Sequence, residues 1–106
     1  MVSMGQLKEI SRQIARAFDP ERIILFGSHA RGDATETSDV DLLVIARTSA
    51  PKPRRSVPLY SMLRHHSFSK DILVYTPDEV EEYRHLRASL IARALDEGIV
   101  LYEKQA

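Results

Sequence analysis

Two aspartates separated by one residue form the pattern in this sequence that is best suited to chemistry. Asp39 and Asp41 stand at the start of an apolar run that continues to Ala46. Because side chains on a β-strand alternate between faces, both carboxylates are predicted to project from one face, with Cα atoms about 6.5 Å apart. That spacing allows them to share two divalent cations about 3.5–4 Å apart. Without cations the carboxylates would raise each other's pKa and destabilise the adjoining core.

A glycine–serine pair supplies a complementary, phosphate-binding pattern. Gly27 and Ser28 directly follow an apolar strand predicted at Arg22–Phe26, and His29–Arg31 are predicted to form the first turn of a helix. Glycine lets the backbone turn sharply and approach a ligand closely. Free N–H groups at a helix N-terminus bind phosphate oxygens, the Ser28 hydroxyl adds a donor, and Arg31 is a further candidate phosphate ligand. Each motif alone is commonly a turn or a strand start, and their combination indicates a function.

A third carboxylate comes later in the chain. Asp71 lies just before the apolar run Ile72–Val74, in a strand predicted over 68–76. Taken alone, it is an acid at the start of a strand. Beside the earlier pair it is the candidate third metal ligand and the candidate general base that accepts the proton of an attacking hydroxyl.

The spacing of these motifs resembles the signature of a known superfamily. Gly27-Ser28, ten further residues and then Asp39-Val40-Asp41 resemble the signature of the DNA polymerase β-like nucleotidyltransferases. The longer strings Gly27–Asp33 and Ser38–Val44 resemble its small prokaryotic branch, the minimal nucleotidyltransferases. The resemblance implies that Asp39, Asp41 and Asp71 bind two Mg²⁺ ions and that Gly27 and Ser28 hold the phosphates of a nucleotide.

Composition limits the remaining possibilities. With 106 residues, the chain is predicted to form one domain over 1–106. Lysine plus arginine and aspartate plus glutamate number 15 each, which argues against binding to nucleic acid by bulk charge attraction. The sequence has no cysteine, no basic segment followed by an apolar leader and no apolar run long enough to span a membrane. We therefore predict a cytoplasmic protein without a membrane partner.

The remaining elements are predicted from hydrophobic periodicity and from capping residues. In order they are a helix from the Ser3 cap to Phe18, strands at 22–26 and 39–46, a helix at 57–66, a strand at 68–76, helices from the Thr76 cap with a break near 86–88, and an edge strand at 99–102 after Gly98. This order predicts an α/β (α+β) fold: a small mixed sheet covered mainly on one face by helices, with the acids on the other, more open face.

The segment from Arg47 to Val57 allows two interpretations. It contains Lys52, Arg54 and Arg55 among prolines. The favoured interpretation is a solvated loop that leads into a helix. The alternative is a basic lip that meets nucleotide phosphates, RNA or an acidic partner.

The leading hypothesis is a Mg²⁺-dependent nucleotidyltransferase that moves AMP from ATP to a hydroxyl and releases pyrophosphate. The minimal nucleotidyltransferases resemble antitoxins paired with HEPN-family ribonuclease toxins, which implies that the acceptor is a tyrosine of such a toxin. One alternative is a binding module that occludes its partner without chemistry. Another is nucleotidyl transfer to a small molecule such as an antibiotic, in a pocket built between subunits of an oligomer.

Overall fold

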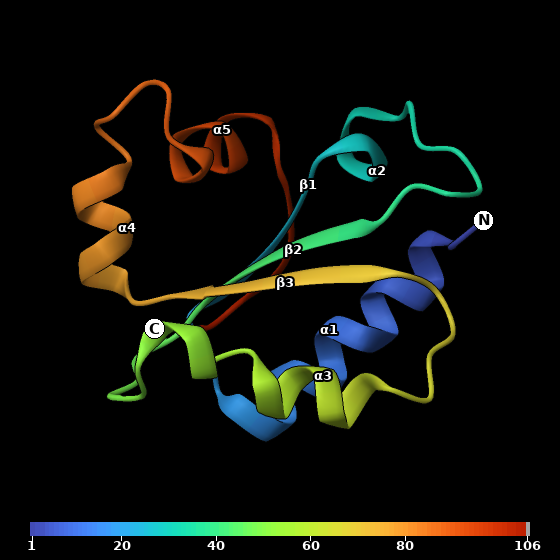
Figure 1. Ribbon diagram of the computed structural model, residues 1–106, viewed down its shortest axis with the longest axis horizontal. Helices are drawn as coiled ribbons and strands as arrows, with labels where there is room; N and C mark the ends of the chain where they lie inside the picture. Colours follow the sequence, from blue (N-terminus) through green and yellow to red (C-terminus); the bar gives the residue numbers. More distant parts are fainter. Residues whose placement is uncertain (106) are drawn as a thin grey trace.

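A four-stranded mixed sheet, with helices against it, forms the framework of the molecule. The computed structural model describes residues 1–105 (Figure 1). The elements are α1 (Met4–Phe18), β1 (Arg22–Phe26), α2 (Ser28–Arg31), β2 (Val40–Ile45), a 3₁₀ turn (Lys52–Arg54), α3 (Val57–Leu63), β3 (Lys70–Tyr75), α4 (Pro77–Tyr83), α5 (Leu90–Glu97) and β4 (Ile99–Glu103). Each predicted helix and strand is present, with ends that differ by a few residues.

The strand order is β3-β2-β1-β4. β1 runs antiparallel to both β2 and β4, whereas β2 and β3 run parallel to each other. The sheet is therefore mixed, and β4 lies at an edge, as predicted. The buried strand β2 holds the centre, which explains why its sequence is apolar past Asp41.

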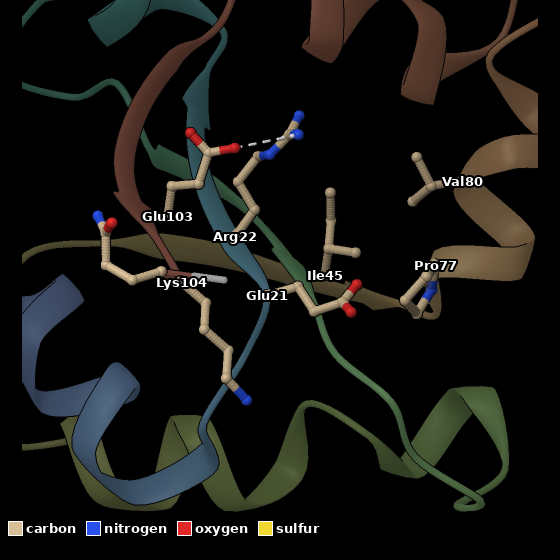
Figure 2. A pocket seen from close by; sticks show the side chains of 8 residues that line it. Glu21, Arg22, Ile45, Pro77, Val80, Glu103 and Lys104 are labelled. Atoms are coloured by element: carbon tan, nitrogen blue, oxygen red, sulfur yellow. Dashed lines mark ion pairs between the residues drawn. The ribbon is translucent and has the colours of Figure 1, made fainter.

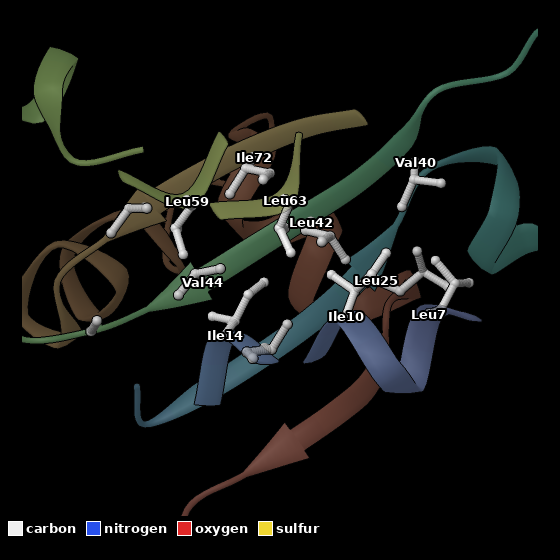
Figure 3. Packing of buried hydrophobic residues seen from close by; sticks show 13 residues of the cluster. Leu7, Ile10, Ile14, Leu25, Val40, Leu42, Val44, Leu59, Leu63 and Ile72 are labelled. Atoms are coloured by element: carbon white, nitrogen blue, oxygen red, sulfur yellow. The ribbon is translucent and has the colours of Figure 1, made fainter. Parts of the chain in front are cut away.

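One face of the sheet packs on α1 and α3 (Figure 3). Every second residue of the strands points to this face, among them Leu25 of β1 and Leu42 of β2. The helices contribute an apolar stripe at helical spacing, made by Leu7, Ile10, Ile14, Leu59 and Leu63. This is the larger of the two apolar clusters.

The opposite face carries helices as well. Ile24, Leu43 and Ile45 alternate with the residues of the first cluster and pack against Val80 of α4 and Ile91 of α5. Figure 1 shows α4 and α5 on the side of the sheet opposite α1 and α3. Asp41 shares this face by alternation with Leu43, at the end of β2 that lies toward α2 and α5.

Local signals start the helices where the sequence places them. Ser3 and Gln6 form a reciprocal capping box at α1, and Thr76 and Glu79 form another at α4. Asp19 ends α1 in a left-handed conformation before Pro20. Within residues 1–105, no helix is both long enough and apolar enough to cross a bilayer.

The basic segment differs from its favoured interpretation. Arg55 is not solvated: its side chain is 10% exposed, and its guanidinium Nη1 lies 2.6 Å from Glu79 Oε1. Arg54 is exposed, as predicted. The sequence could not distinguish these two arginines, because the partner of Arg55 lies 24 residues further along the chain.

Candidate active site

The register of the sheet brings two predicted site residues side by side. Asp41 of β2 pairs with Asp71 of β3, and on its other side Asp41 pairs with Phe26, the residue before the Gly27–Ser28 turn. Neighbouring strands lie about 4.8 Å apart. Asp71 alternates with Leu73, which packs on the same face as Leu43, so both carboxylates belong to one face of the sheet.

The pKa of Asp41 reflects the carboxylates that lie around it. Burial raises the pKa of the Asp41 carboxyl, and the neighbouring carboxylates of Asp71 and Asp39 raise that pKa further. His29 and Arg31 act in the opposite direction, by favouring the ionised form. Asp41 therefore lies at the centre of a group of like charges, where a cation would be strongly attracted.

Hydroxyl groups hold the two outer carboxylates. Ser69 Oγ donates a hydrogen bond to Asp39 Oδ1, and Tyr60 Oη donates one to Asp71 Oδ1 at 3.3 Å. Burial is the main cause of a raised pKa at Tyr60, so this hydroxyl keeps its proton. Sequence reasoning assigned no role to Ser69 or Tyr60, because their partners lie 30 and 11 residues away.

The Gly27–Ser28 turn meets Asp41 closely. Gly27 has φ +77°, a conformation that side chains disfavour, and a Cβ at this position would overlap the Asp41 carboxylate. Ser28 begins α2, whose first N–H groups have no partner within the helix. Since α2 has only four residues, its dipole is small, and the donors of the turn itself must account for any anion binding.

A cleft of about 300 Å³ opens beside this turn. It is lined by Phe26, Gly27, Ser28, Arg31, Asp41, Leu90, Arg93, Ala94 and Glu97. Four predicted site residues, Gly27, Ser28, Arg31 and Asp41, thus share one cavity. Asp39 and Asp71 do not line it, and Asp71 joins the group through its pairing with Asp41.

Two arginines enter this cleft from different helices. Arg31 of α2 lies near two carboxylates, with nitrogens 3.4 Å from Asp33 and 3.8 Å from Glu97. Arg93 of α5 forms no ion pair with any described residue. Arg93 was missed in the sequence, because only the packing of α5 brings it to the turn, and the apolar stripe around Ala94 gives no sign of it.

A larger cleft, of about 550 Å³, lies at the opposite end of β1 and β2 (Figure 2). Its walls include Glu21, Arg22, Glu103 and Lys104, over an apolar floor that includes Ile45 and Val80. The charges there are already matched: Arg22 pairs with Glu103 at 3.4 Å and Lys104 with Asp19 at 2.9 Å. The smaller cleft, which has the Asp41 carboxylate and the close glycine turn, is the candidate site.

The carboxylates at the smaller cleft and beside it suit a hard cation. Asp39, Asp41 and Asp71 offer only carboxylate oxygens, which Mg²⁺ prefers. Among residues 1–105, no three acidic, histidine or cysteine side chains are already gathered at metal-binding distances. The raised pKa of Asp41 nevertheless marks a site where a cation would relieve repulsion between carboxylates. The residues therefore fit Mg²⁺ in chemical type.

Comparison with known proteins decides the family. The family described as "Polymerase beta, Nucleotidyltransferase" matches residues 8–106, nearly the whole chain. The chain belongs to this nucleotidyltransferase family. The resemblance drawn from the glycine–serine and aspartate motifs is thereby confirmed, and so is the prediction that the protein is a nucleotidyltransferase.

Relatives of this nucleotidyltransferase occur in Methanocaldococcus jannaschii. A protein named "Putative protein adenylyltransferase" is 34% identical over 70 residues, which cover 64% of this chain and 70% of that protein. A second protein from this organism, also named "Putative protein adenylyltransferase", is 57% identical over 42 residues, which cover 40% of this chain and 26% of that protein. The match to the second relative is therefore local, over about a quarter of that protein.

Solved structures agree with the nucleotidyltransferase fold. A crystal structure described as a putative nucleotidyltransferase from Sulfolobus solfataricus has a TM-score of 0.61 at 24% identity, covering 92% of this chain and 78% of that one. A structure described as a toxin-antitoxin with AMP-PNP has a TM-score of 0.64 at 20% identity, covering 92% and 74%. At these identities the likeness establishes the fold alone.

Proposed function

We propose that this nucleotidyltransferase transfers AMP from ATP to a hydroxyl of a protein acceptor, a tyrosine of a cognate HEPN-type toxin. The observation that carries the proposal is the pairing of Asp41 with Asp71 directly beside the Gly27–Ser28 turn. The name of the relatives, protein adenylyltransferase, supports AMP and a protein acceptor. Structural neighbours described as toxin-antitoxin support a toxin as that acceptor.

Each residue has a distinct role in the proposal. The turn at Gly27 and the Ser28 hydroxyl bind phosphate oxygens, and Arg31 of α2 and Arg93 of α5 balance the phosphate charge. Asp71 accepts the proton of the attacking tyrosine hydroxyl. The α-phosphorus then gains a bond to that oxygen and loses its bond to pyrophosphate.

Asp39, Asp41 and Asp71 would hold Mg²⁺. When bound, the metal neutralises charge that develops on the phosphate oxygens and lowers the pKa of the acceptor hydroxyl. To bind phosphate, Arg31 must give up its contacts with Asp33 and Glu97. Both contacts are long, at 3.4 and 3.8 Å, so they are weak and easily exchanged.

The direct test uses a purified HEPN-type toxin as the acceptor. With ATP and Mg²⁺, its intact mass should rise by whole AMP units, and Asp41→Asn should abolish the rise while the two proteins still form a complex. If the acceptor's mass stays unchanged while it is still neutralised, the protein is a binding module without chemistry. Transfer to an added aminoglycoside instead would indicate a small-molecule substrate.

A matched pair of glycines tests the turn. Gly27 and Gly32 flank α2, with φ +77° and +88°, so alanine strains the backbone at both. A Cβ at Gly27 would displace the Asp41 carboxylate, whereas a Cβ at Gly32 meets no atom within 4 Å among the described residues. Gly27→Ala should therefore weaken binding of Mg²⁺-ATP at least tenfold more than Gly32→Ala, an effect of about 1.4 kcal/mol or more. If calorimetry shows the same loss of Mg²⁺-ATP affinity in both variants, the nucleotide does not bind at this turn.

A further inference from the structure

Tyr60 bridges a strand amide and a site carboxylate. Its hydroxyl accepts a hydrogen bond from the backbone N–H of Ile72 at 2.7 Å and donates one to Asp71 Oδ1 at 3.3 Å. Ile72 follows Asp71 in β3, so a single hydroxyl holds both the backbone and the side chain at this point of the strand.

The bridge closes the outer edge of the sheet. β3 has only β2 as a strand neighbour, so its outward N–H and C=O groups have no strand partner. The Tyr60 hydroxyl accepts the hydrogen bond from the N–H of Ile72. Two residues further along β3, the carbonyl of Val74 accepts one from Arg55 at 3.4 Å. Both side chains come from α3 or the residues just before it, so this segment replaces a fifth strand at the edge.

We propose that Tyr60 is the positioning residue for Asp71. Its hydroxyl occupies Oδ1, and no described residue donates a hydrogen bond to Oδ2, which leaves Oδ2 available to a cation or to the acceptor hydroxyl. Ser69 holds Oδ1 of Asp39 in the same way. Both outer carboxylates thus have one oxygen fixed by a neighbouring hydroxyl, the arrangement by which proteins orient metal-binding carboxylates. This inference rests on the proposed function, because it assigns Asp71 to the metal and the acceptor.

Tyr60→Phe tests the proposal, with Tyr75→Phe as its matched control. Phenylalanine keeps the ring and removes only the hydroxyl. Tyr75 ends β3, and no described residue shares a hydrogen bond with its hydroxyl. In an NMR titration of the protein with Mg²⁺ alone, Tyr60→Phe should weaken binding about tenfold and Tyr75→Phe should leave it unchanged. The Ile72 amide should also exchange with solvent faster in Tyr60→Phe only.

A double-mutant cycle separates positioning from general packing. If Tyr60 acts through Asp71, then adding Tyr60→Phe to Asp71→Asn should change Mg²⁺ affinity less than about twofold. A full additional loss in the Asp71→Asn background would overturn the inference, as would unchanged binding by Tyr60→Phe alone. If the wild-type protein shows no Mg²⁺ binding that depends on Asp41, the proposed function falls together with this inference.

Discussion

The two edges of the sheet are built in opposite ways. At the β3 edge, Tyr60 and Arg55 bond to the outward backbone groups of Ile72 and Val74. At the β4 edge, Ile99 and Val100 are 38% and 50% exposed, and the register against β1 shifts between Ile23 and Ile24. One edge is closed by side chains, and the other exposes apolar residues and carries an irregularity.

The difference follows from what each edge carries. Asp71 can face Asp41 only if β3 keeps its register with β2, because a slip of one residue would turn Asp71 to the opposite face. Side chains that bond to the outer edge of β3 fix that register. β4 carries no predicted site residue, so nothing at the site depends on its outer edge. The closed edge is therefore the one that carries a residue of the proposed site.

Of the substitutions at the two edges, removing Arg55 from the β3 edge should lower the free energy of unfolding most. Arg55→Ala loses the ion pair with Glu79 and the bonds to Val74 and Ala50, in a place where the arginine is mostly buried. We expect a loss of about 2–3 kcal/mol in the free energy of unfolding, measured by urea denaturation. Arg54→Ala, one residue earlier and exposed, should change it by less than about 0.5 kcal/mol. Equal midpoints for the two variants would show that the β3 edge does not depend on Arg55.

Acid should weaken the closed edge specifically. The hydrogen bond from Arg55 is the main cause of the lowered pKa of Glu79. A carboxyl whose folded pKa is lowered stabilises the protein above its unfolded pKa, about 4.3, and that contribution is lost as the pH falls through the folded value. The unfolding free energy of Glu79→Gln should therefore decline less than that of wild type between about pH 5 and pH 3. The control Glu82→Gln, which removes an exposed carboxylate, should follow the wild-type curve.

A charge at the open edge should have the smallest effect. Val100→Lys places an ammonium on an exposed position of β4 and should alter the free energy of unfolding by less than about 0.5 kcal/mol. Because charged side chains on an edge strand discourage pairing between chains, light scattering at high concentration should fall or stay level. A loss above about 2 kcal/mol would mean that the β4 edge is covered in the native protein.

The features read correctly from the sequence are local ones. The Gly27–Ser28 turn, the Asp39–Asp41 spacing and the Ser3 and Thr76 caps each depend on residues within a few positions, so composition and periodicity reveal them. The sequence also marked Asp71 as an acid at a strand start. Its alignment with Asp41 depends on strand register, which a pattern in one strand does not encode.

The features that were missed depend on contacts between distant elements. Tyr60 reads as one exposed aromatic residue of a short helix, and its role emerges only when α3 lies against the edge of β3. Arg93 reaches the cleft only because α5 packs over β1. Helices on both faces were likewise not foreseen in full, because the amphipathic stripes of α4 and α5 do not reveal which side of the sheet they cover.

An NMR titration with Mg²⁺ and AMP-PNP measures the central claim most directly. The account predicts that the largest amide shifts occur at Gly27, Ser28 and Asp41, with smaller shifts at Asp71, and that Asp41→Asn removes them. Shifts centred instead on Arg22, Glu103 and Lys104, at the larger cleft, would contradict the account.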